Sequence, residues 1–223
     1  MSGLADSLGR RGEDLLEALG ETGYMLLVSL AAAVLLGLPL GMLVYLTRRG
    51  GAAPNRAVWW TGNLFINVVR SFPFLLLVVF LVPVTRLVYG TTFGTPAATF
   101  SLCFVAVAIY ARLVEQILRE ISPGIPRVAR TMGATLPQTI VRFLLPEAFP
   151  GLVYALTSAT ISLLSYSTVL GVVGGGGIGD FALRYGYQEY DYPLMYFTIA
   201  VILVVVLVIQ SIGHRLSIRL DHR

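Results

Sequence analysis

The sequence predicts an all-α integral membrane protein with about five transmembrane helices. Its 223 residues are 56% hydrophobic and only 13% charged, whereas soluble domains are roughly 25% charged because a folded surface must be solvated. The apolar residues are also grouped into runs of about 20, the length at which a helix crosses a bilayer. No segment alternates apolar and polar residues as the strands of a membrane barrel do, so the spans are predicted to be helical.

Four apolar runs are long enough to cross a membrane without interruption. They cover residues 24–46, 97–114, 148–173 and 193–212. A fifth run, 65–84, contains Arg70, Ser71 and Pro73. Proline removes a backbone donor and interrupts a helix, so a break is expected there. Unpaired carbonyls at such a break are tolerated within a membrane where they line a cavity.

The arginines predict the orientation of the chain, since the sequence has no lysine. One side of the predicted spans carries the arginines at positions 48, 49, 56, 112, 119, 127, 130, 142, 215, 219 and 223. The other side carries those at 10, 11, 86 and 184, and Arg70 lies near a boundary. The positive-inside rule therefore places the loop 120–147 and the C-terminus in the cytoplasm, with the N-terminus outside.

Three regions are expected along the chain. Residues 1–21 form an extracytoplasmic amphipathic lead-in, 22–214 form the transmembrane domain, and 215–223 form a cytoplasmic tail. A cleaved signal peptide is the alternative for the first region. Acidic residues follow Arg10 and Arg11, however, whereas a signal peptide has a basic start and a shorter apolar stretch.

The loop 120–147 is predicted to be a helical hairpin. A first helix begins near Pro123, whose missing donor is harmless in a first turn, and runs to about Met132. Gly133 suits the left-handed position after a helix. Thr135 and Gln138 have the spacing of a capping box for a second helix. A hairpin that merely connects two spans is the simpler interpretation.

The spacing of this hairpin resembles the cytoplasmic EAA loop of ABC importer permeases. Gly133 stands at the position of the family glycine, and Leu145-Pro146 at its Leu-Pro end. Arg127 replaces the family glutamate, so an ion pair made by that glutamate is not carried over. The stretches MGATLPQTIVRFLLPEAFPGL and YSTVLGVVGGGGIGDFALRYGYQEYD look like the methionine-type permeases. The resemblance leaves out about the first 20 residues.

The resemblance implies a type I importer permease that works as a homodimer. Its expected partners are a second copy, two cytoplasmic ATPase subunits, an extracytoplasmic substrate-binding protein and membrane lipid, with no nucleic acid. The implied substrate is L-methionine, with D-methionine as a further candidate, and the implied location is the bacterial inner membrane. The residues implied to couple to the ATPase are Ala129, Met132, Gly133, Ala134, Thr135, Pro137, Gln138, Leu145 and Pro146.

The apolar run 148–173 is rich in hydroxyl groups. Ser158, Ser162 and Ser165 share one helix face at i, i+4 and i+7. Such hydroxyls either bond to neighbouring helices or line an aqueous path, and both interpretations stay open. The candidate pathway residues are Asn67, Arg70, Ser71, Ser158, Ser162, Ser165 and Tyr166. For Arg70, snorkelling to the membrane surface is the alternative.

The glycine run 174–179 contains the pattern G-x-G-x-x-G. This pattern binds dinucleotides only between a strand and a helix, and here it follows a membrane helix. The glycines are expected to permit a sharp turn or close contact. The candidate residues for binding-protein docking or gating are Gly176, Gly177, Gly179, Asp180, Arg184 and Tyr187. The alternative for the tyrosines of this loop is an interfacial aromatic belt.

Several classes of function are disfavoured by the sequence. Cys103 has no second cysteine for a disulfide, and the two histidines, His214 and His222, lack neighbouring metal ligands. No Walker A motif is present, so ATP and Mg²⁺ are expected only in the partner ATPase and the chain itself is not expected to be an enzyme. A permease for another small ligand, a secondary transporter and a membrane scaffold are the alternatives. Secondary transport usually needs carboxylates within the spans, and none is predicted there.

Overall fold

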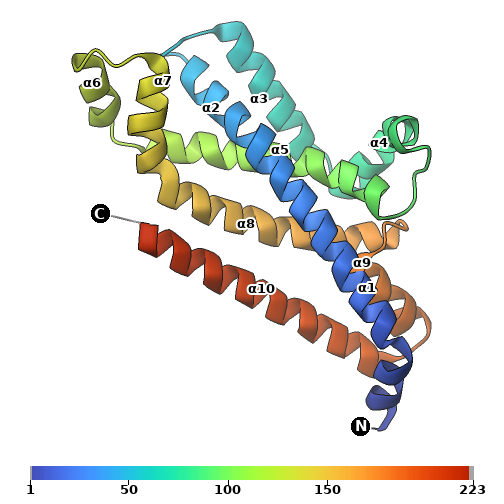
Figure 1. Cartoon of the computed structure of the whole chain (residues 1–223). Helices are drawn as coiled ribbons and strands as arrows, with labels where there is room; N and C mark the ends of the chain where they lie inside the picture. Colours follow the sequence, from blue (N-terminus) through green and yellow to red (C-terminus); the bar gives the residue numbers. More distant parts are fainter. Residues whose placement is uncertain (1, 221–223) are drawn as a thin grey trace.

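The computed structural model describes residues 2–220, and side chains from residue 4 onward. Within that range the structure contains helices and turns and no strand, as the sequence predicts. Figure 1 shows the long helices running across one another in a bundle. The helices are α1 Ser2–Ala32, α2 Leu38–Thr47, α3 Arg56–Ser71, α4 Phe74–Tyr89, α5 Thr95–Glu120, α6 Gly124–Thr131, α7 Leu136–Thr139, α8 Leu145–Val172, α9 Gly177–Phe181 and α10 Tyr192–Leu220.

Four helical stretches are long and apolar enough to cross a membrane. They are Leu4–Thr47, Thr95–Glu120, Leu136–Val172 and Tyr192–Leu220. The pair α3 and α4 gives a fifth if counted as one span, but the chain bends by 114° between its two parts. The break falls between Ser71 and Phe74, and Pro73 lies within it. The prediction of four continuous spans and one interrupted span is confirmed, although the interruption is a sharp bend.

Three short π-helical segments occur within the described helices: η1 Ala33–Gly37, η2 Ile140–Leu144 and η3 Ala182–Gln188. The first two end two residues before a proline, Pro39 and Pro146. A proline ring clashes with the carbonyl four residues earlier in a regular α-helix, and a wider turn relieves that clash. In η2 the Leu145 amide donates to the Ile140 carbonyl, five residues back. The helix therefore continues through both prolines.

The core of the molecule lies along α5, which packs against α1, α2, α3, α4 and α8. Small residues allow the closest approach between helices. A Cβ atom added to Gly41 of α2 would lie 2.3 Å from the Ala111 carbonyl oxygen of α5. A Cβ added to Gly213 of α10 would lie 2.0 Å from Thr157 Oγ1 of α8. The described spans are thus fixed to one another by backbone proximity and apolar packing.

The N-terminal region is continuous with the first span. Helix α1, Ser2–Ala32, runs unbroken through residue 21. The stretch Leu4–Thr47 has 44 residues, or roughly 66 Å at 1.5 Å per residue, about twice the thickness of the hydrocarbon layer. Leu15 and Ala18 pack with Ile178, Phe181 and Leu194. Tertiary contacts therefore hold this region against α9 and α10.

Candidate functional site

The hairpin formed by α6, α7 and η2 is closed by local hydrogen bonds. The Ala134 amide donates to the Ala129 carbonyl at 3.0 Å, and the Gly133 amide donates to the Arg130 carbonyl at 3.0 Å. This pair of bonds is the Schellman motif, which ends a helix with a left-handed residue. Gly133 has φ of +70°, as predicted. The turn is thus specified by its own residues.

The second half of the hairpin starts with the predicted capping box. Thr135 and Gln138 form it, and the Thr135 amide donates to Gln138 Oε1 at 2.9 Å. Pro137 lies in the first turn, where it interrupts no hydrogen bond. The helix then continues through η2 into α8 as one apolar stretch, Leu136–Val172. The second half of the hairpin is therefore joined to α8 without a break.

The hairpin exposes several large apolar side chains. Met132 is 70% exposed, and Val128, Leu136 and Val141 are also exposed, whereas Ala129 is fully buried beneath them. Of these four exposed residues only Met132 was a candidate coupling residue. Val128, Leu136 and Val141 could have been found from the sequence, because they are apolar residues within an otherwise polar loop. We call Val128, Met132, Leu136 and Val141 the apolar tip; exposed apolar patches of this kind mark interaction sites.

The remaining predicted coupling residues lie at the start of α8 or at the turn of the hairpin. Leu145 packs against the main core cluster, and Pro146 is exposed in the first turn of α8. Ala134 lies half-buried at the turn. Arg127, Arg130 and Arg142 are exposed on the hairpin, so the apolar tip is surrounded by positive charge.

Two of the predicted pathway residues on α8 form hydrogen bonds to their own helix. Ser162 Oγ donates to the Ser158 carbonyl at 3.1 Å, and Ser165 Oγ donates to the Ile161 carbonyl at 3.2 Å. Bonds from these two hydroxyls to neighbouring helices, one of the two interpretations, are therefore not seen. Their acceptor lone pairs stay available, and Ser165 is exposed in the single chain. The face is compatible with an aqueous path.

The other predicted pathway residues are only partly brought together. The Tyr166 ring packs on Phe74, at 4.7 Å between centroids, beside the break that follows α3. Ser158 lies eight residues earlier on α8, about 12 Å along the helix axis. Arg70 and Ser71 are exposed at the end of α3. The structure thus places Tyr166 at the bend.

A buried charge network on α3 and α5 was missed by the sequence reasoning. Glu115 is 1% exposed and is paired with Arg112 and with Arg119, at 2.5 Å. Arg112 also donates to Asn67 Oδ1 at 2.6 Å. A buried carboxylate needs such partners because desolvation of an unpaired charge is costly. The sequence could have predicted these ion pairs, because Arg112 and Arg119 lie three residues before and four residues after Glu115, on one face of α5.

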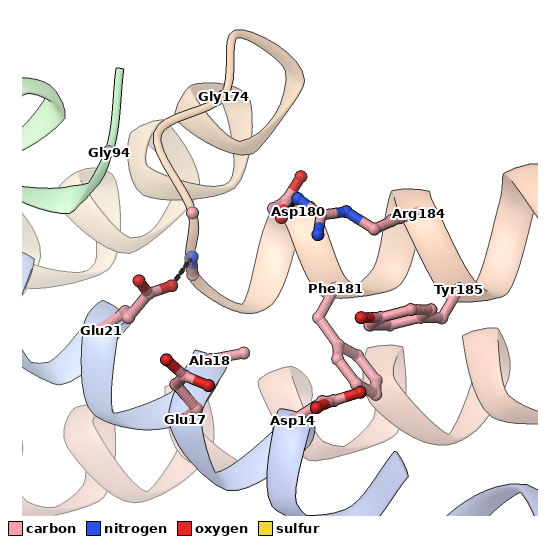
Figure 2. Close-up of a pocket in the computed structure, with 12 residues that line it drawn as sticks. Asp14, Glu17, Ala18, Glu21, Gly94, Gly174, Asp180, Phe181, Arg184 and Tyr185 are labelled. Atoms are coloured by element: carbon pink, nitrogen blue, oxygen red, sulfur yellow. Dashed lines mark hydrogen bonds and ion pairs between the residues drawn. The ribbon is translucent and has the colours of Figure 1, made fainter. Parts of the chain in front are cut away.

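At the opposite end of the molecule, the glycine run is tied to α1 (Figure 2). The Gly177 amide donates to Glu21 Oε2 at 2.6 Å, and Thr95 Oγ1 donates to Glu21 Oε1 at 2.6 Å. The Ile178 amide donates to Thr22 Oγ1 at 2.8 Å. We call Glu21, Thr22, Thr95 and residues 174–178 the outer clamp. It joins the first span, the start of α5 and the glycine run.

The glycines of the outer clamp are needed both for conformation and for space. Gly174, Gly176 and Gly177 have φ between +75° and +81°. A Cβ at Gly176 would lie 2.5 Å from Glu21 Oε2. A Cβ at Gly179, the next glycine along the chain, would lie 2.4 Å from the Thr168 carbonyl oxygen. The prediction of a sharp turn with close contacts is confirmed.

A cavity of about 290 Å³ adjoins the outer clamp. Figure 2 shows Asp14, Glu17 and Glu21 on one side and Asp180, Arg184 and Tyr185 on the other. Arg184 donates to Asp180 at 2.6 Å. Farther along α1, Arg11 pairs with Glu189 at 2.8 Å. Tyr187 is 61% exposed, and Arg184 beside it is also exposed.

Comparison with known proteins places the chain among transport permeases. Residues 37–222 match the family described as binding-protein-dependent transport system inner membrane component. The probable D-methionine transport system permease protein MetI of Vibrio cholerae is 42% identical over 209 residues, covering 94% of this chain and 93% of that one. The methionine import system permease protein MetP of Bacillus subtilis is 36% identical, covering 81% and 82%.

Solved structures show the same fold. A chain of the MetNI methionine ABC transporter, in an inward-facing conformation, has a TM-score of 0.90 at 38% identity, covering 93% of this chain and 96% of that chain. An amino acid ABC transporter crystallised with histidines has a TM-score of 0.79 at 19% identity, covering 96% and 97%, and this likeness concerns the fold alone. The Vibrio relative aligns over 209 of the 223 residues, so the similarity extends into the first 20 residues, contrary to the sequence-based expectation.

Proposed function

The chain belongs to the family of binding-protein-dependent transport system inner membrane components, and from this membership we propose that it is the membrane-spanning subunit of an ATP-driven methionine importer. In this role two copies form the translocation pathway. Two ATPase subunits bind the hairpins from the cytoplasm, and a substrate-binding protein delivers methionine from outside. ATP and Mg²⁺ bind to the ATPase subunits. The expected location is the bacterial inner membrane, with the C-terminus inside.

The observation that carries the coupling role is the continuity between the apolar tip and α8. The tip exposes Met132 and three further apolar side chains on a turn closed by the Schellman motif. From Leu136 the helix runs without a break to Val172. A partner that binds the tip and moves on binding ATP therefore displaces the hydroxyl face of α8. Such a movement changes which side of the membrane reaches the pathway, by shifting the population between two states.

The substrate assignment is supported by the relatives named for methionine transport and is tested by uptake. The permease is reconstituted in vesicles with its ATPase subunit and binding protein, and uptake of labelled L-methionine is measured with ATP on the ATPase side. We expect uptake to require ATP and to be competed by D-methionine more strongly than by unrelated amino acids. Uptake that needs no ATPase and follows an ion gradient would contradict the proposal.

The orientation is tested separately by labelling single cysteines in intact cells. Cys103 is the only cysteine, so Cys103→Ser provides a background without thiols. Thr131→Cys, exposed on the hairpin, is expected to resist a membrane-impermeant thiol reagent until the cells are opened. Tyr187→Cys, on the opposite end, is the matched control and is expected to react at once. The reverse pattern would place the hairpin outside the cell and exclude the cytoplasmic coupling role.

A further inference from the structure

A basic cavity lies at the end of the molecule that carries the hairpin, away from the outer clamp. Its volume is about 760 Å³. It is formed by the end of α2, the loop that leads into α3, the first turn of α3 and the end of α5. The residues that line it are Thr47, Arg48, Arg49, Gly50, Pro54, Asn55, Arg56, Trp59, Trp60 and Arg119. None of these residues belongs to the hairpin that is proposed to bind the ATPase subunits.

All charged side chains that line the cavity are arginines. Arg48, Arg49 and Arg56 form no ion pair with any carboxylate of the described residues, and Arg48 lies over the Tyr45 ring at 4.2 Å. Arg119 pairs with Glu115 but remains 47% exposed. Guanidinium groups bind phosphate oxygens in a bidentate manner. The cavity is therefore suited to an anion with several oxygens.

The aromatic lining indicates the height of the cavity in the membrane. Tryptophan is enriched where the bilayer meets water, and the chain has only two, Trp59 and Trp60. The Trp59 indole nitrogen is buried without a hydrogen-bond partner in the part of the chain that the structure describes. An unpaired buried donor is unfavourable, and this one belongs to a residue that lines the cavity.

An exposed apolar stripe leads away from the cavity along α3. Trp60, Leu64 and Val68 follow one another at intervals of four residues, so they lie on one face. They are 58%, 44% and 45% exposed, respectively. A hydrocarbon chain that starts at the cavity can lie along this stripe. A soluble anion has no hydrocarbon chain that could contact this stripe.

We propose that this cavity binds the headgroup of an anionic phospholipid, with the phosphate among Arg48, Arg49 and Arg56 and an acyl chain along Trp60, Leu64 and Val68. Basic pockets between membrane helices on the cytoplasmic side bind lipid phosphates in this manner. Positive charge at this end also orients the chain in the membrane. Orientation, however, requires only the number of charges near the membrane, not their convergence on a cavity beside an unpaired indole.

The two tryptophans allow a direct test, because both line the cavity and the full chain has no others. The purified full-length permease is placed in bilayers of phosphatidylcholine that contain a minor fraction of bromine-labelled phosphatidylglycerol. Bromine quenches tryptophan fluorescence on contact. The reference sample contains the same fraction of bromine-labelled phosphatidylcholine. We expect the anionic label to quench more strongly, and the preference to vanish in about 1 M salt, where the Debye length is about 3 Å.

A variant and a matched control assign the preference to the cavity. In Arg48→Gln/Arg49→Gln/Arg56→Gln the preference for the anionic label is expected to fall by about fivefold for each arginine removed, until the two labels quench equally. The control Arg142→Gln/Arg215→Gln/Arg219→Gln removes three exposed arginines elsewhere on the predicted cytoplasmic side. It is expected to keep the wild-type preference.

Four outcomes would overturn the proposal. The first is equal quenching by the two labels in the wild type at low salt, which needs no variant and so does not depend on whether the variant folds. The second is a preference that falls equally in the variant and the control, which would reflect general charge. The third is abolition of the preference by millimolar inorganic phosphate, which would identify a site for a free anion. The fourth is exclusion of the lipid label by bound ATPase subunit, which would identify a protein contact.

Discussion

The hairpin and the outer clamp both depend on left-handed glycines, but they are stabilised in opposite ways. At the hairpin, Gly133 has no heavy atom within 4 Å of the position of a Cβ, and its turn is closed by bonds between residues at most five apart. At the outer clamp, the bonds from the Gly177 and Ile178 amides reach residues 156 positions earlier. A glycine in open space is chosen for its backbone angle alone. A glycine in a tertiary clamp also provides space for a distant partner.

The largest effect on stability is expected from a substitution beside the outer clamp, at Gly171 of α8. A Cβ there would lie 2.2 Å from the backbone nitrogen of Asp180, and a backbone atom cannot move aside cheaply. We expect Gly171→Ala to lower the free energy of unfolding by about 3 kcal/mol or more, the upper range for overpacking. Thermal unfolding of the purified protein in detergent measures this effect.

The matched control for that substitution is Gly133→Ala at the hairpin. There only the left-handed backbone opposes the methyl group, at a cost of roughly 1–2 kcal/mol, and the change is expected to stay local. Equal shifts in the unfolding temperature of the two variants would show that the space around the glycine does not distinguish the two regions.

An effect of similar size is expected when the carboxylate of the outer clamp is removed. Glu21→Ala loses two hydrogen bonds to a charged acceptor, each worth about 1.5–3 kcal/mol. We expect lower stability and, more specifically, faster hydrogen exchange at the amides of Gly177 and Ile178. Glu17→Ala removes a carboxylate from the same cavity that forms no ion pair with another described residue. Unchanged exchange in Glu21→Ala, or equal exchange in both variants, would contradict the role given to Glu21.

A smaller effect on stability, but a distinct one on function, is expected at the hairpin. A β-branched residue fits the left-handed region poorly, so Gly133→Val should disturb the turn while the buried core of the permease is retained. We expect ATP hydrolysis to become uncoupled from uptake, with several-fold less substrate carried per ATP and with assembly of the complex intact. Normal coupling in this variant would show that the left-handed turn is not required for transmission.

The smallest effect on the isolated permease is expected at the apolar tip. Met132 is 70% exposed, so Met132→Ala should leave the unfolding temperature nearly unchanged. Loss of a central contact at an interface costs more than about 1 kcal/mol, and therefore the affinity for the ATPase subunit should fall by about fivefold or more. Tyr187→Ala, which removes an exposed side chain at the opposite end, serves as the control for that binding measurement. Equal affinities in the two variants would exclude a contact at Met132.

The difference between the two regions also explains what could be predicted from the sequence. Gly133, Thr135 and Gln138 act within a few residues of one another, so their spacing was sufficient to predict the turn and the capping box. Glu21 lay in a region interpreted as a lead-in outside the membrane. Its role depends on where the chain returns 156 residues later, and no local spacing reports such a contact. The Glu115 network was missed for another reason, because its spacing is common on exposed helices and only burial makes it unusual.

The sequence by itself determined the membrane class, the helical spans, the interrupted run 65–84 and the hairpin, because each follows from hydropathy or from interactions between near neighbours along the chain. The tertiary structure decided which faces meet. It turned the interruption into a bend of 114°, joined the lead-in to the glycine run, and gathered arginines from α5 and the loop before α3 around one cavity. These features arise from packing between helices distant in sequence, where the geometry of close approach, and not the local preference of the chain, sets the outcome.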